Sequence, residues 1–363
     1  MGDCPKTSAS SRKRSFTQLC FVQDDRFMKK ILLIRTDRIG DVVLTTPSIK
    51  IVRDHFPQSH IAFMTGPQTR DIVDGNPYLN EIIVYDKKRA HKNIIQNILF
   101  SLKLKRKKFD TAIIFNPSNR IHWITYLANI PMRIGYSRKL KFLLTHFLPD
   151  KKHEGLKSEA LYNEDLLTFL GISSALSRKL YFPIKKESQT KIQDLLKKHN
   201  LHESHFVVMT VSASDRSRIW PSQNFAHLIQ LLYEKLNLKT VLIGHLKKSQ
   251  EVCALSKIAA PNFSETLSLA ELGILFQKAL LHISSDTGPM HIASAVGTPV
   301  ITIFGRTLPG LGPKRWSVLQ GKNTLLHKNI GCNPCLAYLC QLDFDCFKAT
   351  KVEEVFNAVR QYI

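Results

Sequence analysis

Short apolar runs rich in β-branched residues alternate with helical patterns along most of this chain. Runs at 31–35, 60–65, 81–86 and 111–115 predict strands, and the segment 46–53 predicts a helix. Strands that alternate with helices in this way are typical of a parallel sheet covered by helices. We therefore predict an α/β fold.

The alternation pauses once and then restarts. After about Gly171 the sequence becomes a polar helical connector, "KKESQTKIQDLLKKHN", and further strand patterns follow it: "HFVVMTVSAS", "KTVLIG", "ALLHISS" and "PVITIFG". A chain of 363 residues also exceeds what one hydrophobic core usually organises. We predict two doubly wound lobes with a cleft between them, and we expect ligands at the carboxyl ends of the strands.

These patterns also suggest boundaries along the chain. The first residues contain Ser, Lys and Arg but lack the continuous apolar stretch of a secretion signal, and Met28 is a natural beginning for the folded part. We expect a disordered extension over 1–27, an N-terminal lobe over 28–175, a linker over 176–200, a C-terminal lobe over 201–349 and a C-terminal helix over 350–363 that could pack back on the N-terminal lobe.

The charge of the chain is strongly positive. Lys and Arg number 52 and Asp and Glu 29, which gives a net charge of +23. Such a surface favours polyanions, which include nucleic acid, an anionic membrane face and a phosphorylated glycan. The chain carries no recognisable RNA-binding motif, so we expect no specific nucleic acid partner.

The segment 87–108 concentrates basic residues and contains no acidic one. It also holds "NIIQNILF", an apolar stripe at helical spacing. Two hypotheses remain open: a basic amphipathic helix at a membrane surface, or a solvated helix whose apolar face lies in the core. No apolar run approaches the roughly 18 residues of a membrane span, so any membrane contact is peripheral. The seven cysteines, without an export signal, favour reduced thiols and a cytoplasmic location.

The stretch "SSDTGPMHIASAVGTP", residues 284–299, has the pattern of a strand, a turn and a helix. The turn Asp286–Gly288 would lie at a helix N-terminus, which can hold phosphate, and Asp286 would then be aimed at sugar hydroxyls. This combination predicts a nucleotide-sugar site. The alternative is that Asp286 merely caps the helix, and His291 inside the helix is either near the phosphates or structural.

Two further loops follow predicted strands. In "RTDRIGDVVLTTPSI", Asp41 is placed to take a proton from an incoming hydroxyl; Asp37 is the rival acid, and helix capping is the alternative for either. In "VSASDRSRIWPSQNF", serines can donate to phosphate oxygens, and arginines can neutralise a departing diphosphate in place of a metal ion. The formal D-x-D match at 343–345 lies in a Cys-rich tail and receives little weight.

From about Met28 onward the chain resembles glycosyltransferase family 9, the ADP-heptose:lipopolysaccharide heptosyltransferases. The motifs "RIGDVVLTTP" and "DTGPMHIASAVGTP" carry this resemblance together. It implies a GT-B architecture of two Rossmann-like lobes, with the acceptor bound by the N-terminal lobe and the nucleotide sugar by the C-terminal lobe. It also implies inverting, metal-independent transfer of heptose from ADP-L-glycero-D-manno-heptose to the lipopolysaccharide inner core, with no cofactor.

The resemblance further implies roles for individual residues. Asp41 would be the general base, and Arg218 stands where the family commonly has a phosphate-binding lysine. The implied donor-binding residues are Ser212, Ser214, Arg218, Glu251, Asp286, Thr287, Gly288 and His291. Of these, Glu251 is placed as the contact to the adenosine ribose. The implied acceptor-binding residues are Arg38, Arg120, Arg133 and Tyr136.

Other hypotheses stay open. The same fold could use a different nucleotide sugar or an outer-core acceptor, and the positive charge could instead belong to a non-enzymatic polyanion-binding protein. The C-x2-C-x4-C-x5-C tail could close a structural metal site with Cys332, Cys335, Cys340 and Cys346, or hold reduced thiols. We expect the protein in the cytoplasm, with peripheral contact to the anionic inner membrane at its cytoplasmic face.

Overall fold

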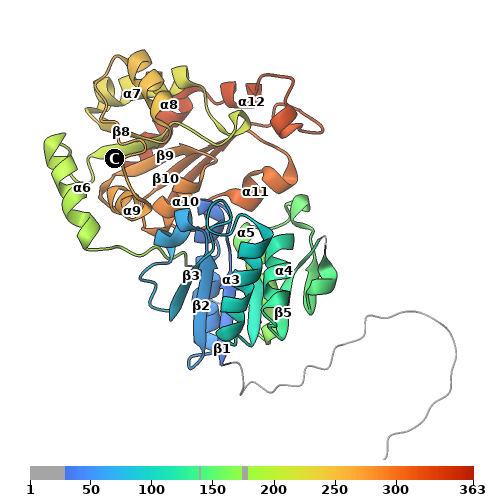
Figure 1. Ribbon diagram of the computed structural model, residues 1–363. Coiled ribbons are helices and arrows are strands. Elements are labelled where there is room, and N and C mark those ends of the chain that lie inside the picture. The colour runs from blue at the N-terminus through green and yellow to red at the C-terminus, as the bar shows by residue number, and fades with distance from the viewer. Residues whose placement is uncertain (1–28, 139, 174–178) are drawn as a thin grey trace, which may run out of the picture.

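The computed structural model describes residues 29–138, 140–173 and 179–363. The expected extension and part of the expected linker lie outside the described residues. The described chain forms two α/β lobes, which lie one above the other in Figure 1 with the N-terminal half below. The predicted fold class, two doubly wound α/β lobes, is confirmed.

The first lobe is built on a six-stranded parallel sheet with the order β3-β2-β1-β4-β5-β6. Its strands are β1 (Lys30–Ile34), β2 (His60–Thr65), β3 (Glu81–Val84), β4 (Thr111–Ile114), β5 (Met132–Ser137) and β6 (His146–Pro149). The central strand β1 pairs with β2 on one side and β4 on the other, and the chain winds outward from it in both directions. This arrangement creates a crevice where the winding reverses, directly after β1.

Helices cover both faces of this sheet. They are α1 (Ile39–Val43), α2 (Thr46–His55), α3 (Ile94–Arg106), α4 (Asn119–Leu127) and α5 (Glu159–Asp165). The helices α3 and α4 pack beside each other and cover one face, where Phe100 and Ile121 join the apolar core. The helix α2 contributes Ile49 and Val52 to the core on the other face.

The second lobe has a five-stranded parallel sheet with the order β11-β10-β9-β7-β8. Its strands are β7 (Phe206–Thr210), β8 (Lys239–Ile243), β9 (Leu281–Ser285), β10 (Val300–Phe304) and β11 (Asn323–His327). Its helices are α6 (Glu187–Lys198), α7 (Ser222–Leu236), α8 (Leu246–Ser256), α9 (Leu269–Lys278), α10 (Gly288–Ala295), α11 (Pro313–Trp316), α12 (Asp345–Lys348) and α13 (Val352–Val359). All residues of β7, β9 and β10 are buried, as parallel strands covered on both faces should be.

The predicted strands appear as β1 to β4 in the first lobe and β7 to β10 in the second, with ends that differ by a few residues. The strands β5, β6 and β11 were not predicted. The edge strand β6, "HFLP", has only half-buried and exposed residues, and such a strand carries little apolar pattern.

The position of the C-terminal helix differs from what the sequence suggested. The helix α13 packs on α7 and β10 of the second lobe, where Val355 and Val359 are fully buried. Beyond it, the hydroxyls of Tyr362 and Thr324 on β11 lie 2.8 Å apart. The expectation that this helix packs back on the N-terminal lobe was wrong, because its apolar face completes the core of the second lobe.

The lobes are joined by packed contacts as well as by the chain. The helix α6 of the polar connector lies against α9 of the second lobe and buries Ile192 and Leu196 there. Just before it, the Lys185 ammonium pairs with Asp74 of the first lobe at 2.8 Å. Among the described residues, no helix is both long enough and apolar enough to span a membrane.

Candidate active site

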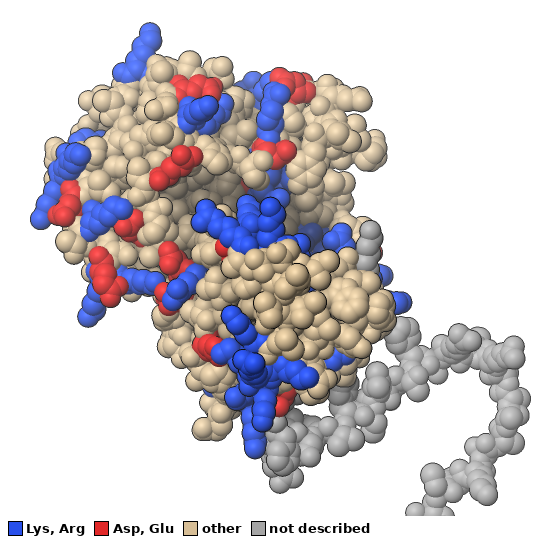
Figure 2. Space-filling model, in the orientation of Figure 1, with Lys and Arg blue, Asp and Glu red and all other residues tan. Residues whose placement is uncertain are grey.

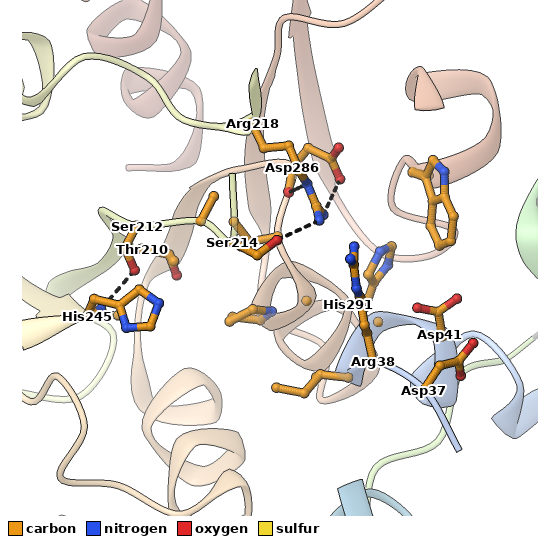
Figure 3. Close-up of a pocket in the computed structure, with 18 of the residues that line it drawn as sticks. Asp37, Arg38, Asp41, Thr210, Ser212, Ser214, Arg218, His245, Asp286 and His291 are labelled. Atoms are coloured by element: carbon orange, nitrogen blue, oxygen red, sulfur yellow. Dashed lines mark hydrogen bonds and ion pairs between the residues drawn. The ribbon is translucent and has the colours of Figure 1, made fainter. Parts of the chain in front are cut away.

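A cavity of about 760 Å³ lies between the two lobes. It is lined by loops that follow strands of both sheets: residues 37–41 after β1, 212–214 after β7 and 286–288 after β9. Figure 3 shows Asp37 and Asp41 on one side of the cavity, away from Ser212 and His245 of the second lobe. The carboxyl ends of the two sheets therefore face each other, as expected for ligand sites of doubly wound folds.

Two glycines allow the lobes to approach at this cavity. The helices α1 and α10 are in contact across the interface. A Cβ added to Gly40 would lie 2.9 Å from the His291 ring, and one added to Gly288 would lie 3.0 Å from Ile39. Any side chain at either position would push the two loops apart, so these glycines permit the close approach of both motifs that the sequence singled out.

Asp41 is buried at the edge of this cavity and is held by Arg35. The same guanidinium contacts Asp37 at 2.7 Å and Glu159 at 2.9 Å, so it bridges three carboxylates. Burial raises the pKa of Asp41 to about 6; the nearby charge of Asp37 acts in the same direction, and Arg35 opposes both. Asp41 is thus a carboxylate with the basicity of a general base near neutral pH.

A second cavity of about 720 Å³ adjoins the first. Both cavities are lined by Asp37, Arg38 and Asp41, so Asp41 stands on the wall that they share. Four further Arg and Lys side chains line the second cavity: Arg35, Arg138, Lys152 and Arg315. With Arg38 they exceed by one the four acids on its walls, Asp37, Asp41, Asp150 and Glu159, and this excess of positive charge favours an anionic molecule.

A buried ion network joins the lobes behind the second cavity. Glu159 is fully buried and accepts from Lys152 at 2.8 Å and from Arg35. Arg315 of the second lobe donates to its other oxygen at 2.7 Å. These cations lower the pKa of Glu159 to about 2 against the effect of burial, so this carboxylate stays ionised and anchors the cluster.

On the other side of the first cavity, two arginines hold Asp286. Arg218 donates to the Asp286 carbonyl at 2.9 Å and to its Oδ1 at 3.1 Å, while Arg306 pairs with Oδ2. A further nitrogen of Arg218 lies 3.3 Å from the Ser214 hydroxyl (Figure 3). Two guanidiniums share one carboxylate, which leaves net positive charge at this point of the cavity. Sequence reasoning did not single out Arg306, although it follows the predicted strand β10.

The N-terminus of α10 opens into the same cavity. No side chain caps this helix, so the first-turn N–H groups, which Pro289 lacks, are available to a ligand. The Thr287 hydroxyl lies 2.7 Å from that of Ser284, and the Ser212 hydroxyl accepts from the His245 N–H at 2.8 Å. Burial lowers the pKa of His291 to about 4, so this side chain is neutral at physiological pH.

Comparison with known proteins decides the family. The profile of a family described as glycosyltransferase family 9 (heptosyltransferase) matches residues 99–344, more than half of the chain. The chain belongs to glycosyltransferase family 9. It is therefore a glycosyltransferase, and its family is that of the heptosyltransferases.

Individual relatives agree with this assignment. Lipopolysaccharide heptosyltransferase 3 of Escherichia coli is 26% identical over 285 residues, which are 74% of this chain and 81% of that protein. The crystal structure of a family 9 glycosyltransferase from Veillonella parvula aligns with a TM-score of 0.83 at 22% identity, over 92% of this chain and 97% of the other. That of E. coli heptosyltransferase WaaC with ADP aligns with a TM-score of 0.70 at 16% identity, over 92% and 100%. The fold is therefore the GT-B architecture that the resemblance implied.

Within this family 9 enzyme, most of the implied donor residues meet in one place. The first cavity is lined by Ser212, Ser214, Arg218, Asp286, Thr287, Gly288 and His291. Glu251 does not join them, because it lies on α8 and pairs with Lys248 at 3.0 Å. An acid that does line the cavity near the start of α8 is Glu265, whose carboxylate lies 3.2 Å from the His245 ring.

The implied acceptor residues do not all lie in one place. Arg38 lines both cavities, but Arg120, Arg133 and Tyr136 line neither. Arg133 donates to the Leu143 carbonyl at 2.7 Å, and Arg120 lies near the Lys87 carbonyl at 3.4 Å.

Tyr136 instead supports a residue of the second cavity. It is buried, and the Lys152 ammonium lies 4.5 Å from the centre of its ring. Tyr136 does not line the second cavity, but Lys152 does, and sequence reasoning missed this lysine. Tyr136 therefore lies behind this cavity and is not part of its wall.

The Cys-rich tail forms a separate small cavity. It is lined by Cys332, Cys335, Cys340 and Cys346, and burial together with the neighbouring thiols raises the pKa of Cys346 to about 11. Among the described residues, however, no group of three or more His, Cys, Asp or Glu side chains is arranged to hold a metal ion. The structural metal site that the sequence suggested therefore stays a prediction. The tail also brings Tyr338 to the wall of the first cavity, beside Arg306.

The formal D-x-D match lies outside the two cavities between the lobes. Asp343 pairs with Arg216 and with Lys348, both at 3.1 Å, and Asp345 pairs with Lys348 at 2.8 Å. Arg216, which the sequence suggested as a phosphate contact beside Arg218, therefore points to this segment and does not line the first cavity.

Proposed function

We propose that this family 9 enzyme transfers heptose from ADP-L-glycero-D-manno-heptose to the inner core of lipopolysaccharide, with inversion and without a metal ion. One observation carries the proposal: Asp41 stands on the wall between two cavities. The first cavity has a helix N-terminus and two arginines suited to a diphosphate, and the second has cations suited to an anionic acceptor. A base between donor and acceptor is what direct displacement requires.

The donor diphosphate would lie at the start of α10. Arg218 and Arg306 would neutralise the negative charge that develops on departing ADP, together with the N–H groups of the helix end. Glu265 would replace Glu251 as the contact to the adenosine ribose, because it lies in the cavity beside His245. The related WaaC, whose structure contains ADP, supports ADP as the nucleotide.

The acceptor hydroxyl would enter from the second cavity. Asp41 accepts its proton as the oxygen attacks the anomeric carbon, and the bond from this carbon to the diphosphate breaks on the opposite side. Attack from the opposite side inverts the configuration. Acidic groups of an inner-core acceptor would pair with Arg38, Arg138, Lys152 or Arg315, which line that cavity. We place the reaction in the cytoplasm at the face of the inner membrane, because such an acceptor is attached to lipid.

Transfer to purified truncated lipopolysaccharides tests this function. We expect heptose to pass from ADP-heptose to a heptose-deficient core in the presence of EDTA, and the product linkage to have the opposite anomeric configuration from the donor. Loss of activity in EDTA, restored by a divalent cation, would contradict metal independence. If other nucleotide sugars or outer-core acceptors react and ADP-heptose with inner core does not, the proposed substrates are wrong although the fold remains.

The rate should also depend on pH in a defined direction. A general base works only when deprotonated, so kcat/KM should fall about tenfold per pH unit below the Asp41 pKa of about 6 and level off above it. Because the charge of Asp37 helps to raise this pKa, Asp37→Asn should move the midpoint to lower pH. The measurement is kcat/KM for the acceptor over a range of pH. An unchanged midpoint in Asp37→Asn would contradict Asp41 as the titrating base.

A further inference from the structure

The helices α3 and α4 form an exposed apolar surface on the first lobe. Five large apolar side chains of α3 are 44–78% exposed: Ile94, Ile95, Ile98, Leu99 and Leu102. Neighbouring α4 adds Trp123, Tyr126 and Leu127, which are 41–48% exposed. We call these eight side chains the α3/α4 surface. A contiguous apolar patch of this kind marks an interaction site in a monomeric protein.

This exposure is not a failure of core packing. The opposite side of α3 carries Phe100 and Leu104, which are buried against the first sheet. The helix therefore has two apolar faces, one in the core and one in solvent. The hypothesis of an apolar face in the core holds for one side of the helix, and the exposed side leaves the hypothesis of a membrane-surface helix open.

Basic residues border the α3/α4 surface at both ends of α3. Lys87, Lys88, Arg89 and Lys92 precede the helix, and Lys103, Lys105 and Arg106 lie at its end. The helix of 13 residues is about 20 Å long, and the second group lies in its last turn. In Figure 2 the front of the lower lobe is a broad tan area with blue side chains above and below it.

We propose that the α3/α4 surface docks the enzyme on an anionic lipid bilayer. The apolar side chains would enter the boundary between headgroups and acyl chains, and the flanking Lys and Arg would contact anionic headgroups. Trp123 and Tyr126 have rings that suit this boundary, because one end is apolar and the other polar. A second copy of the chain fits less well, since pairing two such surfaces would bring together their equally charged borders.

The placement of this surface suits a lipid-linked acceptor, a point that rests on the proposed function. The basic segment before α3 reaches the active site, because Lys88 lines the first cavity. A bilayer on the α3/α4 surface would therefore lie close to the mouth of the cleft. An acceptor attached to lipid could then reach Asp41 without leaving the bilayer.

Vesicle flotation of the full chain tests the docking without nucleotide or acceptor. We expect binding to vesicles of equimolar phosphatidylglycerol and phosphatidylcholine, and at least about tenfold weaker binding to phosphatidylcholine alone. Ile95→Gln with Leu99→Gln should weaken binding to the anionic vesicles about tenfold or more. The control is Tyr233→Gln with Leu255→Gln, two exposed apolar side chains of the second lobe, and this variant should bind as the unaltered protein does.

A second set of variants tests the charge. Changing Lys103, Lys105 and Arg106 to Gln should weaken binding to anionic vesicles about tenfold or more. Changing Lys197, Lys198 and Lys235 to Gln removes the same charge from the second lobe and should change binding much less. Equal binding by both sets of α3 variants and their controls would overturn the proposal. So would a dimer in light scattering that the Ile95→Gln, Leu99→Gln variant dissociates.

Transfer to a lipid-free core oligosaccharide separates this proposal from the proposed function. The α3 variants should retain that activity, because their changed side chains are exposed on α3 and do not line the cavities. Vesicle binding without transfer would contradict the proposed function and leave the docking proposal standing. Transfer without vesicle binding would contradict the docking alone.

Discussion

The variant Asp41→Asn should lose roughly 10²–10⁴-fold in turnover, the usual contribution of a positioned general base. The amide has nearly the shape of the carboxylate but accepts no proton from the acceptor hydroxyl. Arg35 keeps Asp37 and Glu159 as partners, so the change leaves no uncompensated buried cation. We therefore expect the fold and the affinity for ADP to be retained while transfer is lost, which kcat and calorimetric titration of ADP would measure.

A comparison with Asp37, the rival acid, tests which of the two carboxylates is the base. Asp37 contacts the same arginine and lines the same two cavities, but its side chain is more exposed than that of Asp41. Asp37→Asn should retain most of the turnover at neutral pH, and Asp54→Asn, an exposed change on α2, should retain all of it. If Asp37→Asn loses transfer and Asp41→Asn does not, the roles of the two carboxylates must be exchanged.

Much of the first cavity could be predicted because its residues obey one local rule. Ser212 and Asp286 each follow a strand and precede a helix, and Asp41 lies in the first turn of the helix that follows β1. Parallel strands in one sheet end at the same edge. Arg306 obeys the same rule after β10 and could have been found by it. Arg133 breaks the rule, since it lies near the beginning of β5 and hence at the other edge of the sheet.

No comparable sequence pattern pointed to the ion network behind Asp41. Arg35 and Glu159 are 124 residues apart, and Arg315 reaches Glu159 from the other lobe across 156 residues. No local pattern joins such positions, because only the packed arrangement of the two lobes makes them neighbours. For the same reason the sequence left two hypotheses for α3, whose two apolar faces differ only in what packs on them.

The variant Arg306→Gln should weaken binding of ADP by roughly tenfold to a hundredfold and lower turnover further. Arg306 is buried and pairs with Asp286, so its loss removes a charge-assisted hydrogen bond and leaves one carboxylate oxygen without its cation. The net charge at the proposed diphosphate site falls by one, which disfavours both bound and departing ADP. Calorimetric titration with ADP and single-turnover transfer would measure the two effects.

Two further arginine variants make this test specific. Arg216→Gln removes an equal charge from the same lobe, but its guanidinium is exposed and pairs with Asp343 outside the first cavity, so ADP affinity should change little. Arg306→Lys keeps the charge and loses the planar fork, and it should fall between the unaltered enzyme and Arg306→Gln. If Arg306→Gln binds ADP as tightly as Arg216→Gln, the diphosphate does not depend on Arg306, and Arg218 with the α10 terminus must hold it alone.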